Sequence, residues 1–182
     1  QCQETARGKA CTVRGVCGKP QDVAALQDLL LHALKGIAFY GVRARALGVS
    51  ELDTDRFVLQ GLFATVTNVN FDAERFRALV HEALARRDAL ADGYRAAYRA
   101  ANGAEPEDVL PDAASWTPPN DDPTELLVKG IQVGITAAPH ENEDVRSLKS
   151  LILLGLRGTA AYAAHAHALG FEDDLVNAFF FE

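Results

Sequence analysis

No cysteine follows Cys17 in this chain of 182 residues, although three cysteines stand among its first 17 positions. Secreted domains that depend on disulfides usually carry an even number of cysteines at regular spacings. Three cysteines in one short segment therefore argue against a disulfide framework. We expect a cytoplasmic protein in which the thiols serve one local site.

Long apolar runs are also missing, since none reaches the roughly 18 residues of a membrane span and no signal segment leads the chain. The sequence contains no G-x-x-x-x-G-K-S/T loop for nucleotide phosphates. Positive charge is scarce, with 18 Lys and Arg residues against 25 Asp and Glu, a net charge of -7 and a pI near 5.2. We therefore expect neither a nucleic acid nor a membrane as the main partner.

The three thiols lie in the segment QCQETARGKACTVRGVCGKP, where eight residues separate Cys2 from Cys11 and five separate Cys11 from Cys17. Clustered thiols are ligands for metal ions, and the basic residues of this segment favour the thiolate form. Its glycines would let backbone amides turn toward sulfur. The spacing lacks the C-x2-C pairs of most structural zinc sites, so the residues alone leave zinc, iron-sulfur and no metal open.

The sequence opens on Gln1 and supplies three thiols where metal sites usually take four ligands. We therefore expect a further ligand upstream of Cys2.

Helical periodicity dominates the rest of the chain, in which 48% of the residues are hydrophobic. Apolar residues recur every three or four positions over residues 21–47, and shorter patterns predict a helix after Asp53 or Thr54 and a third from about 72 to 100. Arg87 falls on the face of the third helix that we expect to be solvated. These three helices predict a compact antiparallel bundle at residues 21–101.

A connector follows at residues 102–123, where five of the seven prolines and many acidic residues gather. Trp116 stands within it, and we expect its ring to dock the connector onto a bundle.

The chain contains an internal repeat, because a shift of 122 residues aligns residues 22–48 with 144–170 without a gap, at 13 identities in 27 positions. The identities include apolar positions, Gly36 with Gly158 and Tyr40 with Tyr162. We therefore predict an all-α fold of two sequential three-helix bundles behind a cysteine-rich N-terminal loop at residues 1–20.

The second bundle would occupy residues 124–182 and look truncated, with a short helix near 124–128 and a long one at 142–169. The three phenylalanines at positions 179–181 would be costly to leave in water. We expect them to pack against polypeptide that follows in a parent protein, or against a second copy.

The sequence closely resembles the N-terminal helical domain of hybrid cluster proteins, also called prismane proteins or hydroxylamine reductases. The resemblance rests on the cysteine segment and on VAALQDLLLHALKGIAFYG, FVLQGLFATVTNVNFD and ENEDVRSLKSLILLGLRGTAAYA, and it covers essentially the whole chain. That family binds a cubane iron-sulfur cluster through C-x2-C-x7-8-C-x5-C. The resemblance implies that Cys2, Cys11 and Cys17 are ligands of a [4Fe-4S] cluster whose fourth cysteine lies three positions before Cys2.

The same resemblance implies a role in electron transfer. An external donor protein would reduce the cluster, which would pass electrons to a hybrid iron-sulfur-oxygen cluster held by later domains. Hydroxylamine is reduced there to ammonia and water, and nitric oxide reduction is a related activity. No catalytic residue is expected within residues 1–182.

Two other interpretations keep the helical fold without the redox role. The thiols could hold zinc in a helical interaction module, or the chain could be a metal-free scaffold. Bound iron with a visible sulfur-to-iron absorption would distinguish the redox protein from both.

Overall fold

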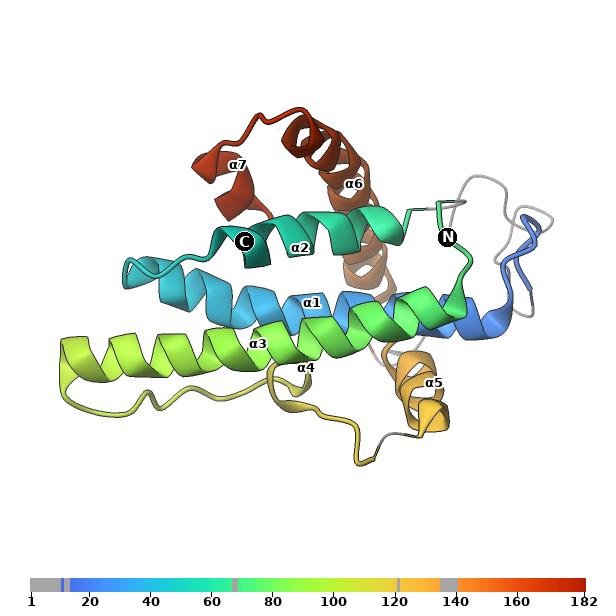
Figure 1. Ribbon diagram of the computed structural model, residues 1–182. Coiled ribbons are helices and arrows are strands. Elements are labelled where there is room, and N and C mark those ends of the chain that lie inside the picture. The colour runs from blue at the N-terminus through green and yellow to red at the C-terminus, as the bar shows by residue number, and fades with distance from the viewer. Residues whose placement is uncertain (1–10, 12–13, 67–68, 121, 135–140) are drawn as a thin grey trace.

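The computed structural model describes residues 11, 14–66, 69–120, 122–134 and 141–182. These residues form seven α-helices and no strand, which confirms the all-α prediction. Figure 1 shows the helices, whose bounds are α1 Gln21–Ala46, α2 Leu52–Ala64, α3 Ala73–Asn102, α4 Asp112–Ser115, α5 Pro123–Val133, α6 Glu143–Ala168 and α7 Asp174–Phe179.

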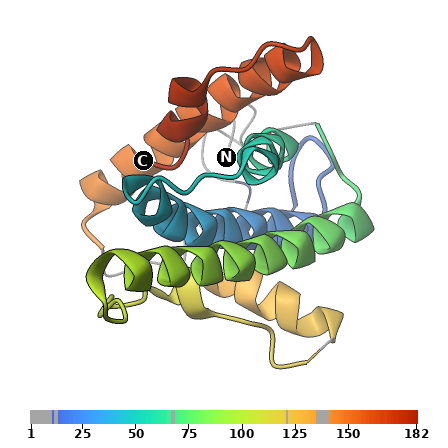
Figure 2. The same cartoon turned by 60° about the vertical axis from the view of Figure 1, so that its left-hand side comes forward.

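Helix α1 lies at the centre of the molecule (Figures 1 and 2). Its main neighbours are α3 along its length, α5 and α4, while α6 and α7 pack against α2. The core of α1 is formed by side chains that are at most 5% exposed, among them Leu26, Leu29, Leu30 and Ile37. Burial of such apolar surface is the main force that holds the helices together.

The helix ends follow from local capping. Asp72 caps α3, since its carboxylate accepts a hydrogen bond from the Arg75 amide. Gly48 and Gly170 end α1 and α6 at φ values of 76° and 83°, in the left-handed region that glycine adopts without steric cost. Each glycine is the last residue of one copy of the repeat, 22–48 and 144–170.

Helix α1 is long and apolar enough to cross a membrane by length and composition alone, at a mean hydropathy of 1.2 over its most apolar 18 residues. However, 67% of that stretch is buried inside the fold. A central bundle helix meets the same criteria. The finding is therefore weak evidence for a membrane span.

The connector after α3 runs back along α3 and α1. Asp108 binds it to both helices, because its carboxylate accepts hydrogen bonds from the Tyr94 hydroxyl at 2.6 Å and from Arg43 Nε at 3.1 Å. The Trp116 side chain is half-buried and packs against the core, with Lys129 Nζ 5.3 Å from its ring centroid. Trp116 thus docks the connector, as its isolated position in the sequence predicts.

The hydrogen bonds from Tyr94 and Arg43 hold the pKa of Asp108 below its ordinary value of 3.8. A carboxyl whose pKa is lowered by folding stabilises the fold fully above its unfolded pKa, and this contribution is lost as the pH falls through the folded pKa. We expect acidification below about pH 4 to weaken the connector, and an Asp108→Asn variant to show a flatter dependence of stability on pH. Urea denaturation between pH 3 and 6 measures the free energy of unfolding of both proteins, with the exposed-site variant Asp92→Asn as control. Identical pH profiles for Asp108→Asn and the wild type would contradict this role of Asp108.

Arg87 is not on a solvated face, so that expectation was wrong. The residue is 1% exposed, and its guanidinium donates hydrogen bonds to the carbonyls of Trp116 at 2.5 Å and Ala113 at 3.4 Å and to Asp88 at 2.8 Å. The connector folds over this face of α3 and turns two carbonyl oxygens toward it. Helical periodicity does not reveal such a cover, because the connector has no periodic pattern of its own.

The C-terminal phenylalanines also depart from expectation. Phe180 and Phe181 are only 8% and 4% exposed within this chain, whereas Phe179 is 54% exposed. The Phe181 ring lies over Gly41, where a Cβ atom would come within 2.2 Å of the ring, and the Arg45 guanidinium stands 3.9 Å from its centroid. Phe181 therefore packs on α1, and both buried rings leave water within this chain.

The second three-helix bundle is not confirmed. Helix α5 packs on α1 and helix α6 on α2, so both use the first three helices as their support. The repeat is nevertheless visible in the helix bounds, because α6 begins and ends 122 residues after α1, and α7 begins 122 residues after α2.

Candidate metal centre

Cys17 is held in a tight turn just before α1. The Gly18 amide donates a hydrogen bond to the Gly15 carbonyl at 2.9 Å, and the Gly15 amide donates one to the Lys19 carbonyl at 3.0 Å. Gly18 has a φ of 93°, which a side chain would disfavour. A Cβ atom at Gly15 would lie 3.0 Å from the Cys17 sulfur. The glycines thus let the backbone close around the thiol.

This turn is anchored to the helices by Lys19. Its ammonium donates a hydrogen bond to Gln27 Oε1 at 2.6 Å and lies 5.9 Å from the Phe71 ring centroid. The Gln27 amide group, 5% exposed, donates in turn to the Asn70 carbonyl at 3.4 Å. The anchor therefore joins the cysteine turn, α1 and the connection between α2 and α3.

Sequence reasoning missed this anchor. Its signal was a glutamine on the apolar stripe of α1, four residues after Val23 and three before Leu30. A polar side chain at such a position needs a hydrogen-bond partner.

The structure describes two of the three predicted ligands. Cys17 is half-buried in its turn and Cys11 is exposed, whereas Cys2 lies outside the described residues. Within the described part of the chain, no three His, Cys, Asp or Glu side chains gather closely enough to hold a metal ion.

Two opposite charges, Asp28 on α1 and Arg157 on α6, influence each other electrostatically. Burial raises the pKa of Asp28, and the Arg157 guanidinium opposes that shift. Burial also lowers the pKa of Arg157, which Asp28 raises in turn. The Asp28 carboxylate lies against the backbone of Gly134, where a Cβ atom would be 2.8 Å from Oδ2.

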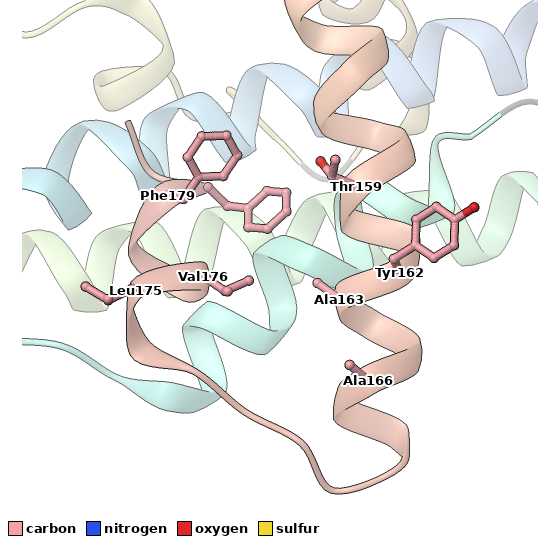
Figure 3. Close-up of a pocket in the computed structure, with 8 residues that line it drawn as sticks. Thr159, Tyr162, Ala163, Ala166, Leu175, Val176 and Phe179 are labelled. Atoms are coloured by element: carbon pink, nitrogen blue, oxygen red, sulfur yellow. The ribbon is translucent and has the colours of Figure 1, made fainter.

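An open apolar groove of about 570 Å³ lies between α6 and α7 (Figure 3). It is lined by Thr159, Tyr162, Ala163, Ala166, Leu175, Val176, Phe179 and Phe180. The lining contains no ionisable carboxylate, amine or imidazole that could act in acid-base chemistry. The apolar lining of this groove suits the packing of apolar side chains.

Comparison with known proteins places this fold in a family, because the sequence profile described as Prismane/CO dehydrogenase family matches residues 1–182. The chain belongs to that family. This confirms the resemblance inferred from the cysteine segment and the repeat. Membership in the Prismane/CO dehydrogenase family implies iron-sulfur clusters in general terms.

Three proteins named hydroxylamine reductase illustrate the similarity. The protein of Nitratidesulfovibrio vulgaris is 51% identical over 182 residues, which cover 100% of this chain and 32% of that protein. The protein of Desulfitobacterium hafniense strain DCB-2 is 55% identical over 179 residues, at 98% and 31% coverage. The protein of Halothermothrix orenii is 47% identical over 179 residues, at 98% and 32%. The chain thus spans about a third of the length of these Prismane/CO dehydrogenase family members.

The described donors fit an iron-sulfur cluster of this family. Cys11 and Cys17 offer the sulfur atoms that such clusters use as ligands. Gly15 leaves the Cys17 sulfur uncrowded, since a Cβ atom at this position would stand only 3.0 Å from it.

Proposed function

We propose that this chain is the electron-transfer part of a hydroxylamine reductase of the hybrid cluster type. In this proposal Cys2, Cys11 and Cys17 bind a [4Fe-4S] cluster, and the fourth thiolate comes from upstream of Cys2. The observation that carries it is the spacing of eight and five residues between the thiols in a chain of the Prismane/CO dehydrogenase family. A bound cluster of this kind supplies one-electron transfer.

The residues of the chain prepare the site for such a cluster. Lys19 brings positive charge to the cysteine turn, which would offset part of the negative charge of a cluster with thiolate ligands. The same lysine fixes the turn to Gln27 on α1, so that the thiol of Cys17 keeps its position relative to the helices. A ligand held in place loses less conformational entropy when the cluster binds.

In our proposal, the catalytic reaction of the whole protein takes place in domains outside this chain. Hydroxylamine takes up two electrons and two protons at the hybrid iron-sulfur-oxygen cluster and yields ammonia and water; nitric oxide is a second candidate substrate. The names of the relatives support this activity. An external protein donates the electrons, and the protein works in the cytoplasm. Residues 124–182 belong to a second helical bundle that is completed outside this chain.

The cluster is tested by replacing its ligands in the parent protein under anaerobic conditions. The wild type should contain iron and sulfide and show broad visible absorption from sulfur-to-iron charge transfer, and after reduction a low-temperature electron spin resonance signal. Cys11→Ser and Cys17→Ser should each lose most of the cubane signal, because serine oxygen replaces a thiolate poorly. The control is Val16→Ser, which changes an exposed residue of the same loop and should keep the signal.

Metal analysis decides between this proposal and a zinc-binding interaction module. Zinc bound to the three cysteines, with the cubane signal absent from the wild type, would overturn the electron-transfer role. Unchanged thermal stability and metal content in Cys11→Ser and Cys17→Ser would instead indicate a scaffold that needs no metal.

A further inference from the structure

Helices α1 and α6 are structural equivalents within one chain. Both have 26 residues, their bounds differ by 122 residues at each end, and both are followed by a glycine in the left-handed conformation, Gly48 and Gly170. The equivalence fixes which residue of α6 corresponds to which residue of α1. Differences in burial between paired residues therefore show what α6 lacks among the described residues.

The apolar side chains of α6 are exposed where those of α1 are buried. Three core leucines of α1 are 0% exposed, whereas their equivalents on α6 are 59 to 65% exposed. The pairs are Leu26 with Leu148, Leu29 with Leu151, and Leu30 with Ile152. A contiguous apolar face of this kind marks an interaction surface.

On α1, the packing partners are α3, which makes the most extensive contact, then α5 and the turn that contains α4. The turn reaches α1 at two residues one helical turn apart. At Gly36 the Ala113 carbonyl oxygen comes so close that a Cβ atom would lie 2.1 Å from it. The Tyr40 hydroxyl donates a hydrogen bond to the next carbonyl, that of Ala114, at 3.2 Å.

The same two residues recur on α6 as Gly158 and Tyr162, but neither has such a neighbour among the described residues. A Cβ atom at Gly158 would meet nothing within 4 Å, and Tyr162 is 80% exposed whereas Tyr40 is 2% exposed. Figure 3 shows the Tyr162 ring pointing away from α7. Glycine inside a helix lowers its stability relative to alanine, so Gly158 is unfavourable unless a backbone approaches it.

We propose that this face of α6 seats a long amphipathic helix and a following turn from the polypeptide that continues the parent protein. The helix covers Leu148, Leu151 and Ile152 as α3 covers α1, and two successive carbonyls of the turn meet Gly158 and Tyr162. The repeat places that helix at about positions 195 to 224 when the numbering of this chain is continued. The relatives have room for it, since this chain covers only 31 to 32% of their length.

A pair of glycine variants in the parent protein tests whether a helix and turn cover this face of α6. Gly155 and Gly158 both lie on α6 with open space where a Cβ atom would stand, but the equivalent of Gly155 on α1 is Ala33, which is 1% exposed. We expect Gly155→Ala to leave the melting temperature unchanged or raise it, and Gly158→Ala to lower it, because the new methyl group meets the carbonyl of the turn. An equal increase for both variants would overturn the proposal.

Hydrogen exchange of the unmutated protein provides a second test. In the parent, the amides of residues 148–162 should be protected about as well as those of residues 26–40. In the 182-residue chain alone, residues 148–162 should exchange at least about tenfold faster, since their covering helix is absent. Fast exchange of residues 148–162 in the parent would contradict the proposal. Protection in the short chain that rises with protein concentration would also contradict it, because a second copy would then cover this face of α6.

Discussion

An Arg87→Ala variant should lose about 3 kcal/mol of unfolding free energy. The guanidinium is buried between α3 and the connector, where it donates hydrogen bonds to the carbonyls of Ala113 and Trp116 and pairs with Asp88. Alanine would leave these carbonyls without their donor and open a cavity beneath the connector. The loss should show as a lower urea midpoint and as earlier hydrogen exchange across residues 108–116.

The matched control is Arg75→Ala, which removes an exposed arginine from the same helix. It should change the unfolding free energy by no more than about 0.5 kcal/mol. Equal effects of the two substitutions would show that Arg87 does not hold the connector. Arg87→Lys should recover only part of the loss, because lysine lacks the planar fork that reaches two carbonyls at once.

A Gly130→Ala variant should be destabilised by about 2 kcal/mol through a backbone clash. Helix α5 crosses α1 at this residue, and a Cβ atom at Gly130 would lie 2.2 Å from the Ala25 carbonyl oxygen. Backbone at Ala25 cannot rotate aside as a side chain would, so α5 has to move off α1. Its neighbour Leu126, 2% exposed, would lose contacts in the same movement.

Gly93→Ala provides the comparison for Gly130→Ala. Gly93 lies inside α3 with nothing within 4 Å of a Cβ position, so alanine should raise stability by roughly 0.5–1 kcal/mol through its helix propensity alone. Thermal denaturation of both variants separates propensity from packing. A stabilised Gly130→Ala protein would mean that α5 does not rest on α1 as closely as the structure shows.

Helix α1 connects the candidate metal centre to the rest of the fold. The cysteine turn is attached to its first part through Lys19 and Gln27, and the connector reaches its later part at Gly36 and Tyr40. Changes in the connector and changes at the cysteine turn therefore act on one rigid element. This explains why one helix carries both apolar packing residues and a buried glutamine.

The helices and their ends were accessible from the sequence because their signals are local. Apolar spacing predicted α1 at residues 21–47 and the structure has Gln21–Ala46, while Asp72, Gly48 and Gly170 mark helix ends through their own hydrogen bonds and dihedral angles. The cysteine spacing pointed in the same way to the family, which the match over residues 1–182 confirmed. The ligand role of Cys2, Cys11 and Cys17 stays a prediction.

Contacts between distant segments were decided only by the tertiary structure. The sequence alone determined an all-α chain, an internal repeat of 122 residues and one cysteine-bearing segment at its start. It did not reveal that the connector covers Arg87, that Phe181 packs on Gly41, or that α5 and α6 rest on the first three helices. Periodicity predicts which face of a helix is buried. Which element packs on that face depends on how well the surfaces of the other elements fit it.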